Sequence, residues 1–209
     1  MRIEIPRDFI PSKIVCVGRN YAEHAAELGN ELPTEPLLFL KAPSALIRNG
    51  DAIHLPDVSD QVEHEAELGI VVDSRCSNIR DDEDPFRYVR GYTCLNDLTA
   101  RDLQRRDGQF TRAKSFDTFC PIGPFIETEL DPADLTVACR VNSVTKQFGS
   151  TSQMVFSVPF LIRYISKMMT LFPGDLIATG TPSGVSPLRK GDLCEVEIEG
   201  IGVLSNPVS

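Results

Sequence analysis

The sequence predicts a β-dominated α+β fold, and three observations support this prediction. The 209 residues can bury a sizeable core and fit one domain. Most segments between the 15 prolines and 14 glycines are short and rich in β-branched or aromatic residues, as strands are. Helices and strands do not alternate regularly, which argues against a doubly wound fold. No repeat or linker divides the chain, so we expect a single domain over residues 1–209.

The strand-like segments are short and apolar, and they are bounded by turn residues. They cover residues 13–18, 36–41, 66–73, 88–96, 123–128, 135–141, 175–180 and 193–200. Helical spacing is found in Tyr21–Leu28 and Ser157–Leu171, with Leu98–Arg106 as a weaker third candidate. The expected chain is therefore mostly strand, with a few short helices.

Capping and turn residues delimit these elements. Asn20 is the expected N-cap of the first helix, and Gly29 is its expected stop. Pro159 falls in the first turn of the second long helix, where proline is tolerated. A Gly-Asp pair precedes an apolar strand in three places, at residues 49–51, 173–175 and 190–192. Glycine permits positive φ, and aspartate can hydrogen-bond its own turn, so we expect tight turns there.

The charge balance excludes several classes of partner. The chain has 21 Lys and Arg against 30 Asp and Glu, which gives a formal net charge of −9. Nucleic acids and anionic membranes favour basic surfaces, so we expect neither as a partner. No apolar run approaches the roughly 20 residues that span a bilayer, and the first 13 residues contain no apolar signal region. We therefore expect a cytoplasmic protein.

The six cysteines are far apart, without a C-x-x-C pair or a Cys/His cluster of zinc spacing. Several lie inside apolar strand-like segments, where cysteine usually packs as a small hydrophobe. Buried structural thiols are therefore favoured over a disulfide, a metal site or a nucleophile.

The segment VEHEAELGIVV (62–72) concentrates carboxylates on one side of an expected strand. Side chains alternate along a strand, so Glu63, Glu65 and Glu67 share one face and His64 points to the other. Such clustering is tolerated if the face is solvated or if a cation lies against it. Carboxylates without a cysteine partner favour Mg²⁺, Mn²⁺ or Ca²⁺ over zinc. His64 is not an expected ligand.

Other polar residues each allow a structural and a functional interpretation. Asp97 follows an apolar strand and is either a further ligand or a helix cap. His24 and Glu27 lie side by side at i, i+3, either as a general-base dyad or as a solvated surface pair. Lys114 and Lys41 lie in small or apolar stretches, and either can meet a substrate anion or extend to water.

The loop Thr179–Val185 follows an apolar strand and supplies hydroxyls and glycine N–H groups. This combination can hold a carboxylate, although such loops are also common in turns without function.

The chain resembles the fumarylacetoacetate hydrolase family in six motifs that follow one another in order. They are GRNYAEHAAEL (18–28), EPLLFLK (35–41), HEAEL (64–68), NDLTARDLQ (96–104), AKSFDTFCPIGP (113–124) and ATGTPSGV (178–185). The likeness extends from Lys13 to Val203 and is greatest to small single-domain members of the acylpyruvase and oxaloacetate decarboxylase type. It implies the fold of the family's C-terminal domain, a mixed β-sandwich roll with short helices, and a homodimer.

The resemblance also implies roles for individual residues. The E-x-E pair and a later aspartate bind Mg²⁺ or Mn²⁺ in relatives, so the implied ligands here are Glu65, Glu67 and Asp97. His24 and Glu27 match a catalytic dyad on a lid over the substrate, with Lys114 beside the metal. The implied substrate contacts are Arg19, Lys41, Gln104 and Thr181. Phe110 departs from the pattern, because close relatives often have tryptophan there, and this change can reshape the pocket near Lys114.

The chemistry implied is the cleavage of a 2-oxo acid held by its carboxylate and keto oxygens. A metal ion would stabilise the pyruvate enolate that forms when the C3–C4 bond of a 3-acylpyruvate breaks. His24, oriented by Glu27, would deprotonate the attacking water. We prefer this hydrolysis because decarboxylation does not need the dyad.

Three alternatives remain open at this point. One is an oxaloacetate decarboxylase, which forms the same enolate by losing CO₂. Another is an isomerase or tautomerase acting on unsaturated 2-hydroxy dioates, of the 2-hydroxyhepta-2,4-diene-1,7-dioate type, which only moves protons. The last is a metal-binding scaffold without turnover.

Overall fold

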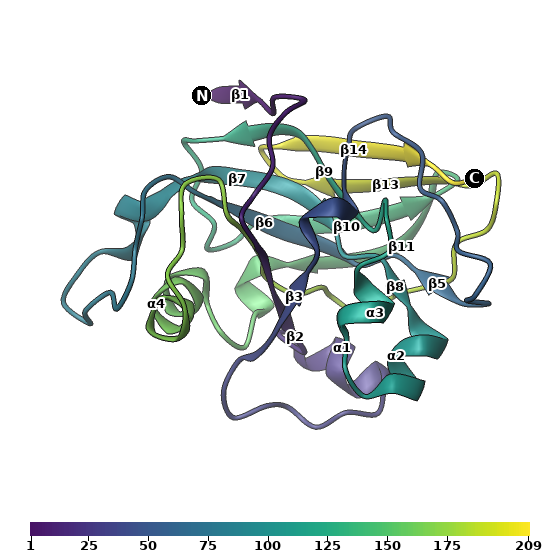
Figure 1. The fold of residues 1–209 in the computed structure, drawn as a ribbon, viewed down its shortest axis with the longest axis horizontal. Helices are drawn as coiled ribbons and strands as arrows, with labels where there is room; N and C mark the ends of the chain where they lie inside the picture. Colours follow the sequence, from purple (N-terminus) through teal and green to yellow (C-terminus); the bar gives the residue numbers. More distant parts are fainter.

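The computed structural model describes residues 1–209, and most of its regular secondary structure is strand (Figure 1). The larger sheet has eight strands in the order β1-β9-β7-β6-β12-β2-β3, with β4 paired to β9. The pairs β12–β2 and β4–β9 are parallel and the others are antiparallel, so this sheet is mixed. Its strands are β1 (Arg2–Glu4), β2 (Ile14–Gly18), β3 (Leu37–Lys41), β4 (Leu46–Arg48), β6 (Ala66–Val72), β7 (Val89–Asn96), β9 (Cys120–Glu127) and β12 (Leu176–Ala178).

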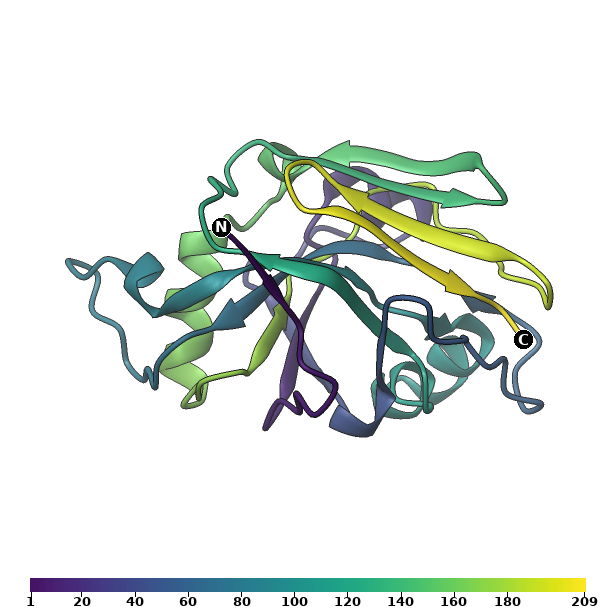
Figure 2. The same ribbon diagram turned by 90° about the horizontal axis from the view of Figure 1, so that it is seen from above.

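A four-stranded antiparallel sheet, in the order β11-β10-β13-β14, packs on one face of the larger sheet (Figure 2). Strands β10, β13 and β14 lie against β6, β7 and β9, and one continuous cluster of buried apolar side chains fills the interior. The strands are β10 (Thr136–Val141), β11 (Val144–Ser150), β13 (Leu193–Ile198) and β14 (Gly202–Pro207). A short ribbon pairs β5 (Val62–Glu63) with β8 (Thr99–Ala100). The expected β-dominated sandwich roll is therefore confirmed.

Three of the four α-helices gather at one end of the larger sheet, beside β3 and β8, whereas α4 lies apart from them (Figure 1). The α-helices are α1 (Ala22–Glu27), α2 (Arg101–Asp107), α3 (Thr111–Lys114) and α4 (Val158–Met168). Three 3₁₀ turns complete the elements: η1 (Pro43–Ala45), η2 (Pro85–Tyr88) and η3 (Thr151–Gln153). No helix is long and apolar enough to cross a bilayer. All six cysteines are buried and free, in agreement with the structural interpretation.

The helix α4 forms because its apolar side chains recur at helical spacing. Val158, Leu161, Ile162 and Ile165 are buried on one face, and Pro159 lies in the first turn as expected. The helix α1 ends as expected too, since Gly29 adopts a φ of 69°. Its N–H and the next one bond back to carbonyls of the last turn, which is a Schellman ending.

Asn20 does not cap α1, which corrects the expectation from its position. Tyr21 is the N-cap residue, without a side-chain cap. The Asn20 side chain is fully buried and instead ties two distant segments together. Its amide nitrogen donates to the carbonyl oxygens of Thr179 and Phe156, at 2.7 and 3.0 Å, and its oxygen accepts from the Phe156 N–H at 2.8 Å. Because Thr179 precedes the Gly180 loop, Asn20 joins α1 to that loop.

The three Gly-Asp turns share one hydrogen-bond pattern. In each, the aspartate carboxylate accepts from the N–H three residues earlier: Asp51 from Arg48 at 2.8 Å, Asp175 from Phe172 at 2.8 Å and Asp192 from Arg189 at 2.7 Å. The glycine before each aspartate has a φ between 84° and 92°. The turns are therefore structural.

Candidate functional site: a buried carboxylate cluster in a cavity

Three carboxylates from neighbouring strands meet at the end of the larger sheet nearest α1, α2 and α3. Glu65 immediately precedes β6, Glu67 lies within it, and Asp97 follows β7. The two strands are antiparallel and pair Ala66 with Asn96, so the start of one lies beside the end of the other. One carboxylate oxygen from each residue lies within 4.8 Å of the other two. The fold thus gathers the three residues implied as metal ligands.

All the glutamates of this segment are buried, so the face is not solvated. Glu63 and Glu65 are 5% exposed and Glu67 is 2% exposed. Glu63 does not join the cluster, because its carboxylate accepts from Arg101 Nε at 2.8 Å. His64 lies on the other side and bonds to Gln147 and Ser186. Buried carboxylates at this density require cations nearby.

The cations are supplied by three buried side chains. Lys114 Nζ lies 2.7 Å from both Glu65 Oε2 and Asp97 Oδ2. Lys41 Nζ lies 2.6 Å from Asp97 Oδ1. Arg101 Nη2 donates to Glu65 Oε1 at 2.5 Å while its Nε holds Glu63. Lys114 is 2% exposed, so it lies inside the site and does not extend to water.

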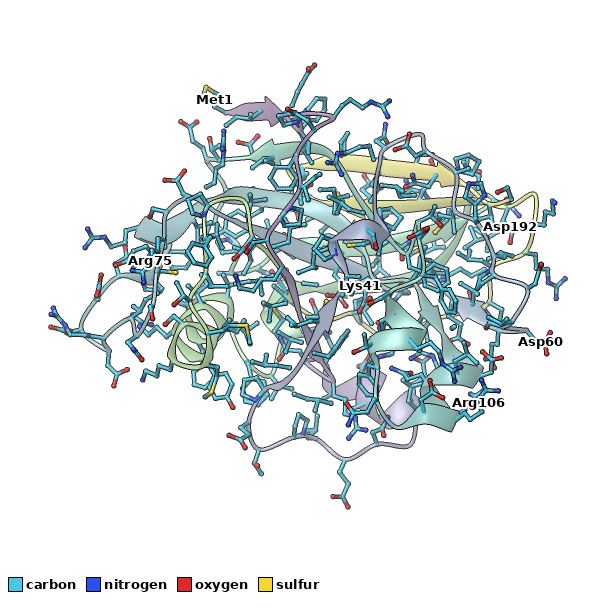
Figure 3. All side chains as sticks on the ribbon, in the orientation of Figure 1. Met1, Lys41, Asp60, Arg75, Arg106 and Asp192 are labelled. Atoms are coloured by element: carbon cyan, nitrogen blue, oxygen red, sulfur yellow. The ribbon has the colours of Figure 1, made fainter.

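Lys41 has a different position from the one the resemblance implies. It is 1% exposed, lies in the middle of the molecule at the end of β3 (Figure 3), and does not line the cavity. Its ammonium donates to Asp97 and to the carbonyl oxygen of Leu98. Lys41 therefore holds Asp97 in place from outside the cavity lining.

The cations and the burial shift the pKa values of the cluster in opposite directions. Burial raises the pKa of Glu65, but the Lys114 and Arg101 charges outweigh it and hold that pKa far below its usual value. Burial lowers the pKa of Lys114, but Asp97 and Glu65 outweigh it and raise the pKa above normal. Glu65 and Lys114 are therefore both charged at neutral pH.

Glu67 differs from the other two carboxylates because no cation contacts it. Its Oε2 accepts from the Gly180 N–H at 2.7 Å, and its other oxygen has no hydrogen-bond partner in the protein. Burial, together with the negative charges of Asp97 and Glu65, raises the pKa of Glu67 well above its usual value. A free carboxylate oxygen among three oxygen-donor residues fits a hard divalent ion such as Mg²⁺ or Mn²⁺.

Metal binding is expected to release a proton from Glu67. In the metal-free protein the raised pKa keeps this carboxyl protonated at pH values where a solvated glutamate is ionised. The ion competes with that proton, so affinity for Mn²⁺ should increase as pH rises toward the raised pKa and level off above it. Calorimetric titrations in buffers of different ionisation enthalpy measure the released proton. A binding enthalpy independent of the buffer, with affinity flat against pH, would contradict this expectation.

The helix α1 places the histidine of the expected dyad against the same cavity. His24 Nδ1 lies 3.2 Å from Glu27 Oε2, and the Gly184 N–H donates to both oxygens of Glu27 at 3.0 and 3.2 Å. The carboxylate accepts from Nδ1, so the neutral ring carries its proton there and leaves Nε2 unprotonated. His24 is only 5% exposed and lines the cavity, whereas Glu27 is exposed, so the histidine of the pair is not a solvated surface residue.

The cavity has a volume of about 470 Å³ and lies between the carboxylate cluster and helices α1 and α2. Most of the residues singled out from the sequence line it: Arg19, His24, Glu65, Glu67, Asp97, Gln104, Lys114 and Thr181. Phe110 lines it as well, and its ring packs edge-on against Phe39 at a centroid distance of 5.3 Å. The site thus joins a carboxylate cluster, a histidine and several cations in one hollow.

Two arginines of the cavity wall were missed from the sequence. Arg101 lies in the first turn of α2, bonds Glu63 and Glu65, and donates to Gln104 Oε1 at 2.6 Å. Arg105 lies one turn later and lines the cavity near its mouth. The only available signal was their position in the helix after Asp97, and surface arginines on helices share that position.

The hydroxyls of the loop Thr179–Val185 are all committed to protein acceptors. Thr179 donates to the Leu68 carbonyl oxygen at 2.9 Å, Thr181 to the Ala66 carbonyl oxygen at 2.8 Å, and Ser183 to Glu23 at 3.2 Å. The N–H groups of Gly180 and Gly184 donate to Glu67 and Glu27. The expectation that these groups hold a substrate carboxylate is not supported, since each already has an acceptor.

Comparison with known proteins shows which family the chain is similar to. The family described as fumarylacetoacetate (FAA) hydrolase C-terminal matches residues 13–209. An uncharacterized protein of Methanocaldococcus jannaschii is 54% identical, with 97% of this chain and 85% of the relative covered. Oxaloacetate tautomerase YisK of Bacillus subtilis is 44% identical, over 95% of this chain and 70% of the relative. The crystal structure of 5-carboxymethyl-2-hydroxymuconate delta-isomerase from Mycobacterium smegmatis has a TM-score of 0.89 and 45% identity, with coverage of 96% and 79%.

Proposed function

Because the chain belongs to the fumarylacetoacetate hydrolase family, we propose that it is a metal-dependent enzyme that moves a proton at C3 of a 2-oxo dicarboxylic acid. One observation carries this proposal: His24, which pairs with Glu27, lines the same cavity as the three-carboxylate cluster. The names of the relatives support proton transfer, since they include an oxaloacetate tautomerase and a delta-isomerase. The reaction class is keto–enol tautomerisation or double-bond isomerisation.

In this proposal Glu65, Glu67 and Asp97 hold Mg²⁺ or Mn²⁺. A bound ion supplies Lewis-acid stabilisation of the negative charge that develops on the keto oxygen when C3 loses its proton. His24 Nε2 is the proton carrier, because Nδ1 is engaged by Glu27 and Nε2 is unprotonated. Glu27 stabilises the imidazolium that forms, and the Gly184 N–H holds Glu27 in place.

Two arginines support a substrate with a second carboxylate. Arg19 lines the cavity without any hydrogen bond or ion pair to the protein, and it has a φ of 58°. Such a strained backbone in a residue other than glycine is typical of functional positions. Arg105 also lines the cavity, and its guanidinium donates one hydrogen bond, to the Gln61 side chain. Two guanidinium groups without a carboxylate partner, at the mouth of one cavity in an acidic protein, suit the distal carboxylate of a dicarboxylic acid.

Replacement of Arg19 tests the distal carboxylate. Arg19→Gln is expected to raise KM for oxaloacetate roughly tenfold, the cost of one charge-assisted hydrogen bond. Affinity for Mn²⁺ should not change, because Arg19 does not contact the carboxylate cluster. Arg75→Gln is the matched control, since Arg75 is exposed at the far end of the molecule (Figure 3). Equal KM values in the two variants would remove Arg19 from substrate binding.

Hydrolysis of 3-acylpyruvates is the second candidate, and the same dyad favours it. His24 can deprotonate a water that attacks the distal carbonyl carbon, and cleavage of the C3–C4 bond then releases a carboxylic acid and pyruvate. Decarboxylation of oxaloacetate needs no attacking water and therefore makes less use of the dyad.

A parallel assay decides among the three reactions. The protein with Mg²⁺ or Mn²⁺ is given oxaloacetate, fumarylpyruvate and an unsaturated 2-hydroxy dioate, and the products are identified. The proposal predicts loss of enol absorbance and deuterium exchange at C3, without pyruvate or CO₂ at a comparable rate. Pyruvate release from the acylpyruvate as the fastest reaction would favour hydrolysis, and CO₂ release would favour decarboxylation.

A further inference from the structure

Strand β11 reverses the usual pattern of burial at two adjacent positions. Phe148 is 71% exposed, whereas its neighbour Gln147 is completely buried. Gln147 is the only buried residue of β11. This strand belongs to the smaller sheet, and Gln147 does not line the cavity. Burying an amide while exposing a phenylalanine is costly unless the amide makes specific hydrogen bonds.

Two backbone groups set the orientation of the Gln147 amide. Its Oε1 accepts from the Ala66 N–H at 3.0 Å, and its Nε2 donates to the Pro182 carbonyl oxygen at 2.7 Å. An N–H can only donate and a carbonyl can only accept, so the oxygen and nitrogen positions follow from chemistry.

The orientation of the Gln147 amide sets the donor and acceptor roles in its hydrogen bond to His64 and in the bond from His64 to Ser186. Oε1 lies 2.9 Å from His64 Nδ1, which must therefore carry the ring proton. The only partner of Nε2 is the Ser186 hydroxyl, so in a ring that carries its proton on Nδ1 the Nε2 atom is an acceptor. Ser186 Oγ lies 2.8 Å from Nε2 and hence donates to it.

The other side of the amide leads to the cavity. Nε2 also donates to Thr181 Oγ1 at 2.7 Å, so this oxygen acts as an acceptor there. The Thr181 hydroxyl proton is then given to the Ala66 carbonyl oxygen at 2.8 Å. The hydroxyl of this wall residue retains a single lone pair and no proton for a ligand.

We propose that Gln147, held by His64 and Ser186, is a positioning residue that fixes Thr181 at the cavity wall as a hydrogen-bond acceptor. Any hydrogen bond between the Thr181 hydroxyl and a ligand is then one that the ligand donates. An enol hydroxyl or a water molecule meets this condition, and a carboxylate does not. This inference rests on the proposed function in one respect: it takes this cavity to be the substrate site.

The direction of the chain of bonds can be measured on the ligand-free protein without any turnover. The protein contains three histidines, so ¹⁵N-labelled imidazoles can be assigned individually. His64 is expected to carry its proton on Nδ1 at neutral pH, and Ser186→Ala should shift the Nε2 resonance of His64 while leaving that of exposed His54 unchanged. A His64 ring protonated on Nε2, or one that does not respond to Ser186→Ala, would overturn the proposal.

A second arm measures binding. Gln147→Glu keeps an acceptor for the Ala66 N–H but cannot donate to Thr181, and Thr181→Val keeps the shape of threonine but removes its hydroxyl. Each is expected to raise KM for the enol form of oxaloacetate roughly fivefold, the effect of one hydrogen bond. The double variant should be no worse than Thr181→Val alone, because the two residues act as one unit.

Asn206→Asp is the matched control for this arm. Asn206 is a buried amide of β14 that donates to the carbonyl oxygens of Arg48 and Asp51, and it does not line the cavity. The control should keep KM within about twofold. A KM for Gln147→Glu equal to that of the control, or effects that multiply in the double variant, would overturn the positioning role. If the wild-type protein had no activity on oxaloacetate, the proposed reaction would be wrong, but the role of Gln147 would still be tested. The ¹⁵N measurement is made on the ligand-free protein and does not depend on turnover.

Discussion

Glu67→Gln is expected to abolish binding of Mn²⁺ and to reduce metal-dependent turnover by about a thousandfold or more, with the fold retained. Glu67 contacts no cation, so its replacement leaves no buried positive charge without a partner. Glutamine can still accept the hydrogen bond from the Gly180 N–H. The same change at Asp97 would leave Lys41 without its only carboxylate partner in the interior, and loss of one partner of a buried ion pair destabilises a fold by about 3–5 kcal/mol. Glu67 therefore separates loss of metal from loss of structure. Calorimetric titration with Mn²⁺ and thermal unfolding of the metal-free protein measure the two quantities.

Glu63→Gln is the matched control for this experiment. Glu63 comes from the same run of glutamates and is equally buried, but it bonds Arg101 and lies outside the cluster. Its variant should bind Mn²⁺ with an affinity within a few fold of the wild type. If Glu67→Gln bound Mn²⁺ as tightly as Glu63→Gln does, the cluster would not be the metal site.

His24→Gln is expected to lower turnover by about 10² to 10⁴, the usual contribution of a positioned general base. Binding of Mn²⁺ should remain, because His24 contacts Glu27 and lies outside the carboxylate cluster. The loss should appear in deuterium exchange at C3 and in any hydrolysis of acylpyruvates. Decarboxylation of oxaloacetate should be largely spared, since loss of CO₂ requires no base.

Glu23→Gln provides the comparison on the same helix. The Glu23 carboxylate accepts from Ser183, on the loop that also holds Glu27, but it makes no hydrogen bond with the His24 ring. Its variant should retain most of the proton-transfer activity. Equal losses of exchange, hydrolysis and decarboxylation in His24→Gln would contradict the assignment of His24 as the proton carrier.

The fold was predictable where local composition is decisive. The eight apolar segments all form strands, and the buried face of α4 follows from helical spacing. Strands β4 and β8 were missed because each has two or three residues, too few to show a period, and the strand expected over residues 62–72 is divided into β5 and β6. Strand β11 was missed for another reason: its pattern of burial is inverted, with Phe148 outside and Gln147 inside.

The candidate site was only partly predictable. The motifs indicated Glu65, Glu67, Asp97, His24 and Lys114, and the fold brings all five to one cavity. Motifs could not distinguish a residue that lines the cavity from one that supports its wall. Lys41 and Arg101 illustrate this, since the first proved to lie behind Asp97 and the second, passed over in the sequence, lies at the surface of the cavity.

By itself the sequence determined the family, the strand-rich architecture and the types of side chain available for chemistry, because these depend on composition, alternation and short motifs. Only the tertiary structure decided the charge state and the partners of each group. Glu65 is ionised because two cations lie beside it, whereas the pKa of Glu67 is raised because none does. Likewise, Thr181 can only accept a hydrogen bond from a ligand because an amide from the other sheet holds it. Electrostatic and hydrogen-bond energies depend on distances between residues far apart in the chain, and those distances exist only once the two sheets have packed.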